Sequence, residues 1–227
     1  MASNKKIERA LNGPGFFEIS FGVILSLALG VLLAALHLIF KPVEVIAKPP
    51  ETEVSGQVYL LEGSASSSKA QQWKRKRQML ADGAAADVSF TEEELNAWAA
   101  SMTPQPQKGA APATTETLFA PEKVNFRIQK GILQVGLVGK LTVSALGLSR
   151  DMVFQTRGKF VKGDNGYVFS PDELYLGSLP THTVPHLTSL IMERVLAAQE
   201  LPEDLKATWK KLNLVAVEDN TLRLVLP

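Results

Sequence analysis

The sequence contains no cysteine, and this absence removes a large part of protein chemistry. The chain can form no disulfide, and it can supply neither a thiolate nucleophile nor the cysteine ligands of a zinc knuckle or an iron–sulfur cluster. For the same reason, cysteine usage gives no information about the redox compartment of the protein.

The sequence also lacks an excess of charge of either sign. Its 227 residues include 24 Lys and Arg against 23 Asp and Glu, which gives a formal net charge of +1. Such a balance creates no global field that would attract nucleic acid. We therefore expect no nucleic-acid partner.

Catalytic motifs are missing as well: the sequence has no P-loop, dinucleotide fingerprint, GxSxG elbow or HExxH. His182 and His186 have the HxxxH spacing of a helical metal site, but Pro185 between them would place His182 outside the helix. No nearby carboxylate or third histidine completes a ligand set. We expect no metal, no cofactor and no enzymatic activity.

One long apolar run is present, over residues 16–40, and its only formal charge is Glu18. About 20 apolar residues cross the hydrocarbon core of a bilayer. A cleaved signal peptide would instead have an apolar region of roughly 7 to 15 residues followed by a small-x-small cleavage site. The run predicts an uncleaved transmembrane helix.

Basic residues flank this helix unevenly. Two lysines and an arginine lie within residues 5–9, whereas the two lysines of residues 41–53 are mixed with three glutamates. The positive-inside rule then places residues 1–15 in the cytoplasm and the rest of the chain outside. We expect a single-pass protein of the cytoplasmic (inner) membrane with an extracytoplasmic C-terminal domain.

Small residues recur every four positions within the predicted helix, at Gly22, Ser26, Gly30 and Ala34. Such a stripe lets two helix backbones approach closely. It is either a packing face, for a second copy or for another membrane protein, or a coincidence on a lipid-facing surface.

Residues 41–53 contain three prolines, which predict an extended, semi-rigid spacer. A strand over 54–61 and a helix over 67–81 follow. That helix carries a tryptophan and four consecutive basic residues: Trp73, Lys74, Arg75, Lys76 and Arg77. The combination suits the anionic headgroups of membrane lipids. The alternative is a solvated helix face with Trp73 as its anchor in the core.

The next helix begins at Thr91, where Thr91 and Glu94 have the spacing of a capping box. Apolar residues then follow at helical spacing as far as Met102. Residues 103–117 are rich in Pro, Ala and Thr and offer little apolar surface, so we expect a mobile loop there.

From residue 123 to 169 the hydrophobic period becomes two, and turn signals lie at 130–131, 146–147 and 165–166. This pattern predicts an antiparallel meander with one apolar and one polar face. Gly136, Gly139 and Gly158 lie inside its strands and predict bulges or sharp curvature.

The apolar face of the meander needs a cover, and the helix predicted over 185–199 is the best candidate. Its apolar residues Leu187, Leu190, Ile191 and Val195 recur at helical spacing. A helix from Pro202 and a terminal hairpin over 214–226 complete the chain. The predicted fold class is α+β: one transmembrane helix, then a single domain, residues 54–227, in which a curved antiparallel sheet packs on one main helix with shorter flanking helices.

Two stretches, VSFTEEELNAWAAS (88–101) and DELYLGSLPTHTVPHLTSLI (172–191), together with the membrane helix, resemble the YpmS-like bacterial membrane-anchored proteins. Similar layouts occur in TULIP-type lipid-binding domains, where a long curved sheet wraps a helix. The resemblance implies lipid handling at the cell envelope and supplies no catalytic residues.

We therefore expect the outer domain to bind an apolar ligand, such as a lipid or an acyl-bearing envelope precursor, between sheet and helix. The candidate wall residues are Leu133, Val135, Leu137, Met152, Phe154, Leu187 and Ile191. The alternative is that these side chains fill one another's space as an ordinary core. The protein would then be a non-catalytic assembly subunit of a membrane protein complex.

Overall fold

The computed structural model describes residues 13–50, 52, 56–64, 71–102, 119–143, 147–163, 166–184, 186–198 and 203–227. The chain divides into two compact units, Met1–Ile39 and Phe40–Pro227. The loop predicted at 103–117 lies outside the described residues.

The first unit is built on the helix α2 (Phe16–Phe40), which has the bounds predicted from the sequence. Its 25 residues extend about 37 Å at 1.5 Å per residue. Within the described part of the chain it is the one helix long and apolar enough to cross a membrane.

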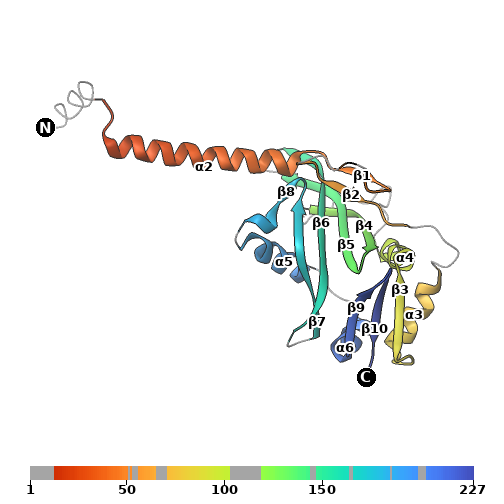
Figure 1. Cartoon of the computed structure of the whole chain (residues 1–227). Helices are drawn as coiled ribbons and strands as arrows, with labels where there is room; N and C mark the ends of the chain where they lie inside the picture. Colours follow the sequence, from red (N-terminus) through yellow and green to blue (C-terminus); the bar gives the residue numbers. More distant parts are fainter. Residues whose placement is uncertain are drawn as a thin grey trace. The chain divides into compact units, whose positions relative to one another are not determined.

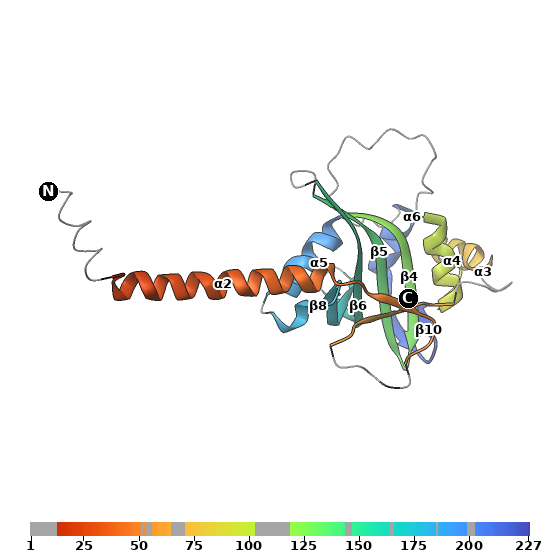
Figure 2. The same ribbon diagram turned by 90° about the horizontal axis from the view of Figure 1, so that it is seen from above.

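The second unit contains a five-stranded antiparallel sheet whose strands follow one another in chain order (Figure 1). The strands are β4 (Phe119–Gln129), β5 (Ile132–Val143), β6 (Leu148–Gly163), β7 (Gly166–Leu176) and β8 (Leu179–Pro180). The meander predicted from the alternating pattern is confirmed. Its long strands curve strongly, as Figure 2 shows.

Glycine shapes this sheet at two points. The β4–β5 turn places Lys130 at φ 53° and Gly131 at φ 71°, the two positive φ values that a tight hairpin turn requires. At Gly158 the register between β6 and β7 shifts, which is a bulge. A Cβ at Gly158 would lie 2.1 Å from the carbonyl oxygen of Ser170, so only glycine fits.

A second, three-stranded sheet has the order β3-β10-β9. The hairpin of β9 (Leu214–Glu218) and β10 (Thr221–Val225) was expected from the sequence. Its pairing with β3 (Asp87–Thr91) was not, because the two partners lie about 130 residues apart in the chain.

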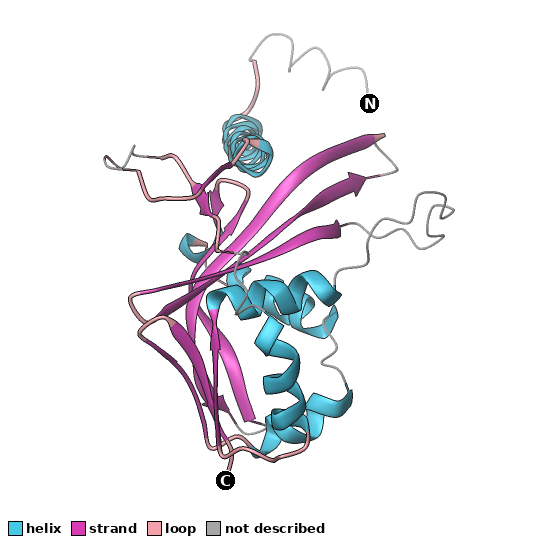
Figure 3. Ribbon diagram, turned by 90° about the vertical axis from the view of Figure 1, so that its right-hand side faces the viewer, coloured by secondary structure: helices cyan, strands magenta, loops and turns pink. Residues whose placement is uncertain are grey.

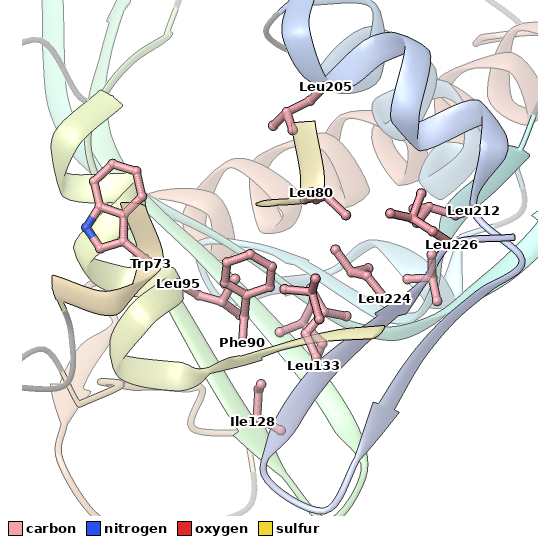
Figure 4. Packing of buried hydrophobic residues seen from close by; sticks show 13 residues of the cluster. Trp73, Leu80, Phe90, Leu95, Ile128, Leu133, Leu205, Leu212, Leu224 and Leu226 are labelled. Atoms are coloured by element: carbon pink, nitrogen blue, oxygen red, sulfur yellow. The ribbon is translucent and has the colours of Figure 1, made fainter. Parts of the chain in front are cut away.

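The larger apolar core joins this second sheet to three helices, α3 (Gln72–Ala81), α4 (Glu92–Met102) and α6 (Glu203–Lys211), and to β4 and β5 (Figures 3 and 4). Its buried members are Trp73, Leu80, Val88, Phe90, Leu95, Ile128, Leu133, Leu205, Leu212, Val215, Leu222, Leu224 and Leu226.

The helix α5 (Leu187–Ala198) covers a smaller cluster formed by Leu137, Phe154, Leu174 and Met192. It is therefore not the main cover that the sequence predicted. The predicted core position Leu190 is also wrong, since its side chain is 56% exposed. Successive helical residues are 100° apart, so Leu190 lies on the far side of α5 from the buried Met192.

The segment expected to be only a spacer contributes the strand β1 (Glu44–Ile46), which pairs in parallel with β2 (Tyr59–Leu61). Leu60 packs on Gly136, where a Cβ would lie 2.5 Å from its Cδ1. We call residues 44–50 and 56–64 the strap. It lies on the polar face of the five-stranded sheet, opposite the apolar cores.

Candidate functional site

The residues predicted to wall an apolar groove are divided between the two cores. Leu133 belongs to the larger core, whereas Leu137 and Phe154 belong to the smaller one and Ile191 packs against it. Met152 is also buried, and Val135 and Leu187 are half-buried. The cavities described below are lined by other residues.

The predicted headgroup site on α3 is largely engaged within the fold. Trp73 is buried and stacks on Trp98 with 6.2 Å between ring centroids. Lys76 Nζ donates to Glu94 Oε2 and to the carbonyl oxygen of Ser89, both at 2.7 Å. The core-anchor alternative therefore accounts for Trp73 and Lys76.

The remaining basic residues of α3 differ in exposure. Lys74 and Arg75 are exposed, and the Nζ of Lys74 lies 5.8 Å from the centre of the Trp73 ring. Arg77 is half-buried. Two of the four cations thus remain open to solvent.

The small-residue stripe of α2 forms a shallow groove of about 850 Å³ along the helix. Gly22, Ser26, Gly30 and Ala34 all line it, together with Pro14, Glu18, Ile19, Val23, Leu27 and Val31. The four predicted packing residues thus share one face.

The motif TEEELN explains how α4 holds the open edge of the five-stranded sheet. Thr91 and Glu94 form the predicted capping box, in which the Thr91 N–H donates to Glu94 Oε2 at 2.9 Å. Asn96 then acts like a peptide group toward the edge strand β4. Its Oδ1 accepts from the N–H of Phe126 at 2.7 Å, and its Nδ2 donates to the carbonyl oxygen of Phe126 at 2.9 Å.

Glu92, one helical turn before Asn96, also bonds to the edge strand. We call the hydrogen bonds of Glu92 and Asn96 to the backbone of β4 the clamp. The Oε2 of Glu92 accepts from the backbone N–H of Ile128 at 2.8 Å, and its Oε1 accepts from the N–H of Ser64 at 2.6 Å. An open strand edge would otherwise be free to pair with another chain. Side chains of α4 instead satisfy three backbone groups of this edge, two at Phe126 and one at Ile128.

Buried polar groups fasten the strap to β4. The Oδ1 of Asn125 accepts from the N–H of Gly63 at 2.8 Å, and its Nδ2 donates to the carbonyl oxygen of Leu61 at 2.9 Å. A Cβ at Gly63 would lie 1.9 Å from the carbonyl oxygen of Phe126, so the strap can approach this closely only at a glycine.

A cavity of about 930 Å³, here called the strap groove, lies between the strap and the polar face of the sheet. Its lining residues on the sheet are Arg127, Gln129, Lys130, Ile132, Gln134, Gln155, Arg157, Glu173 and Tyr175. Pro49, Pro50, Gly56, Gln57, Val58, Tyr59 and Leu61 line it from the strap.

Strand register arranges the polar residues of the groove in rows. Arg127 of β4 lies opposite Gln134 of β5, Gln134 opposite Arg157 of β6, and Arg157 opposite Glu173 of β7. Three spacings of about 4.8 Å make this row about 14 Å long. The next row places Gln155 opposite Tyr175.

Two glutamines form the floor of the strap groove, and each is only 4% exposed. Nε2 of Gln134 donates to Oε1 of Gln155 at 3.2 Å. Among the described residues, nothing donates to Oε1 of Gln134 or accepts from Nε2 of Gln155. Neither of these two atoms is fully enclosed by the protein. Both are therefore open to the space of the groove.

The charged residues of the groove are only loosely paired. Nη1 of Arg157 lies 3.6 Å from Oε2 of Glu173, and Nη1 of Arg127 lies 3.5 Å from Oε1 of Glu92. Burial, followed by the nearby charge of Glu173, raises the pKa of Tyr175 above its ordinary value. Its hydroxyl is a neutral donor near pH 7, as for any tyrosine.

Local sequence signals did not reveal this groove. Gln134, Gln155 and Arg157 lie on the polar face that the alternating pattern predicts, and this pattern does not indicate that another segment covers the face. A strand-like segment with no assigned partner, residues 54–61, was the one signal that something covers this face.

No metal site is present among the residues that the structure describes, where no three His, Asp or Glu side chains converge. His182 lies in the 3₁₀ turn η3 (Thr181–Thr183), outside α5. Its Nδ1 is 3.3 Å from the carbonyl oxygen of Leu174.

No family model, no curated protein and no solved structure matches this chain. The YpmS-like resemblance therefore remains a prediction.

Proposed function

We propose that this chain is a single-pass, membrane-anchored extracytoplasmic binding protein that holds a polar ligand in the strap groove. The observation that carries the proposal is the pair Gln134 and Gln155, almost fully buried, with one amide end of each open to the groove. Buried polar groups in proteins are nearly always hydrogen-bonded, so these ends are suited to water or to a polar ligand.

This proposal changes the ligand class expected from the sequence. An apolar ligand between the sheet and α5 would need space among side chains such as Leu137, Phe154 and Met192, which pack against one another. The strap groove, in contrast, is an open space with polar side chains already aimed at it. The geometry therefore favours a polar ligand.

The proposed location is supported by α2 and its flanking charges. The helix is long enough to anchor the chain, and by the positive-inside rule the basic residues before it favour a cytoplasmic N-terminus. Only three residues, 41–43, separate α2 from β1, so the strap is tied to the anchor by a short connection.

We propose binding rather than catalysis. Glu173 is the single carboxylate among the described residues that line the groove, and it lies beside Arg157. The part of the lining that the structure describes includes no histidine, serine or threonine that could form a nucleophile and base pair with it.

The test is to purify the full-length chain in dodecyl maltoside and analyse aqueous and organic extracts by mass spectrometry. The variant Gln134→Leu/Gln155→Leu removes both amides and leaves no unpaired partner, which limits the cost to stability. The pair Thr142→Val/Ser149→Ala is the matched control, because these hydroxyls face each other at 3.4 Å on the same two strands, outside the groove.

We expect a polar compound in the aqueous extract of the wild type and the control, and its loss from the glutamine double variant. A compound retained by the double variant, or the absence of any polar compound from the wild type, would contradict the proposal. A stoichiometric lipid in the organic extract would restore the apolar ligand expected from the sequence.

A second candidate function is assembly within the membrane. The groove along α2 is lined by every member of the small-residue stripe, which favours close packing against another helix. The partner would be a second copy or another membrane protein. Gly22→Leu/Gly30→Leu should then dissociate a complex detected by crosslinking in membranes, and an unchanged crosslinking pattern would contradict this role.

A further inference from the structure

We infer that the strap groove selects an anionic ligand, held through a phosphate or carboxylate group by the guanidinium of Arg157. The inference rests on the proposed function of the groove and adds the chemical class of the ligand and the residue that determines it. Three observations carry it: the hydrogen-bonding state of Arg157, the charge of the lining, and the neutral donors beside it.

Arg157 has donors that the protein does not use. A guanidinium carries five N–H groups, yet Arg157 donates a hydrogen bond to none of the described residues. Its contact with Glu173 is 3.6 Å, longer than the 2.7 to 2.9 Å of a charge-assisted hydrogen bond. The side chains of Arg157 and Glu173 are 43% and 41% exposed, so a ligand can reach both. Phosphate and carboxylate groups match the paired donors of such a guanidinium.

The lining carries more positive than negative charge. Among the described lining residues, Arg127, Lys130 and Arg157 accompany a single carboxylate, Glu173, whereas the whole chain is almost neutral. Glu92 compensates Arg127 from outside the groove. Lys130 has no ion pair with any residue in the described ranges, which leaves a local positive excess for an anion.

Neutral donors lie next to Arg157. Nε2 of Gln155 has no acceptor among the described residues, and Gln155 lies opposite Tyr175 in the register of β6 and β7. The hydroxyl of Tyr175 is a neutral donor at neutral pH, as for any tyrosine, and its raised pKa keeps it so at higher pH as well. A cationic ligand would find few acceptors here, chiefly Glu173 and Oε1 of Gln134. The donor-rich arrangement therefore fits an anion better than a cation.

Substitution of Glu173 should change the affinity for an anion in the direction opposite to substitution of Arg157. Its carboxylate shares Arg157 and repels an incoming anion. If an anion binds at Arg157, Arg157→Gln should weaken binding by about tenfold or more, since it removes a charge-assisted paired contact. Glu173→Gln should tighten binding by about two- to fivefold. A purely structural role of this ion pair would change binding in the same direction for both variants.

The probes are sn-glycerol 3-phosphate and D-glucuronate, with glycerol and D-glucose as their uncharged counterparts. Binding to the full-length chain in dodecyl maltoside is measured by isothermal titration calorimetry at low ionic strength. The two anions distinguish a phosphate-bearing from a carboxylate-bearing ligand. Arg150→Gln is the matched control, because Arg150 is an exposed arginine of the same strand β6 outside the groove.

We expect at least one anion to bind the wild type and Arg150→Gln, with the opposite changes stated for Arg157→Gln and Glu173→Gln. Failure of both anions to bind the wild type, or binding that Arg157→Gln leaves unchanged, would overturn the inference. If an uncharged probe binds and only Gln134→Leu/Gln155→Leu abolishes it, the proposed function stands and the anion inference fails. If no probe depends on the groove and no polar compound co-purifies, both fail.

Discussion

Replacing Asn96 with alanine should be among the most damaging single changes in the second unit. Asn96 is 7% exposed and makes three hydrogen bonds through its amide. It pairs with both backbone groups of Phe126, at 2.7 and 2.9 Å, and donates to the carbonyl oxygen of Ser64 at 3.1 Å. The change therefore removes contacts that join α4, β4 and the strap.

The magnitude follows from these contacts. Three hydrogen bonds contribute about 1 kcal/mol each to stability, and an unsatisfied backbone group in a partly buried place costs about 1 to 2 kcal/mol more. The expected loss is about 4 kcal/mol, a large fraction of the stability of an ordinary domain. Asn96→Asp should also be destabilising near pH 7, because a carboxylate would face the carbonyl oxygens of Phe126 and Ser64 that now accept from Nδ2.

Urea unfolding of the full-length chain in detergent, followed by tryptophan fluorescence, measures this loss. All three tryptophans lie in the second unit, and Trp98 is two residues from the substituted position. The control is Gln78→Ala, which removes an exposed amide that donates to Asp82 at 2.9 Å. Gln78→Ala should cost less than about 0.5 kcal/mol. A loss below about 1 kcal/mol for Asn96→Ala would refute the clamp.

Further changes test the strap, the core, the pH dependence and the topology, all but the last by the same unfolding assay. Gly63→Ala should displace the strap and lower stability, because its Cβ would collide with a backbone carbonyl; wild-type stability would contradict the close approach. Leu190→Asp should be tolerated, whereas Met192→Asp should cost several kcal/mol; equal effects would reject the register of α5. A hydrogen bond from Arg223 lowers the pKa of Asp87, so the stabilisation from this pair is present above about pH 4 and is lost as the pH falls below it. The stability difference between wild type and Arg223→Gln should therefore shrink toward pH 2, and a constant difference would show that the pair is not responsible. Alkaline phosphatase fused to the C-terminus should be active in a bacterium. An inactive fusion, with a cytoplasmic reporter active at the same point, would show that the orientation is the opposite of the predicted one.

The parts of the fold that were predictable have local causes. The apolar run of α2, the alternation in β4 to β7 and the capping box at Thr91 each depend on residues a few positions apart. The turn at Lys130 and Gly131 is similar, because its backbone angles are set by two residues. These features were confirmed for that reason.

The parts that were missed depend on residues far apart in the chain. The strap reaches Asn125 through a glycine 62 positions earlier, and β3 pairs with the last strand of the chain. The strap groove combines side chains of four strands with a segment that precedes them. The alternating pattern says that one face of the sheet is polar, but it does not say whether solvent or another part of the chain covers that face.

The motif that carries the family resemblance is therefore better evidence for architecture than for ligand. In TEEELN, Thr91 and Glu94 cap the helix, whereas Glu92 and Asn96 satisfy the backbone of the edge strand. Any domain with a helix docked on an exposed sheet edge needs such groups, whatever it binds. The groove residues lie on strands outside this motif, where side chains can change without breaking the clamp. An anchor and a clamp of this kind are thus compatible with either an apolar or an anionic ligand, and the variants of Arg157 and Glu173 distinguish the two.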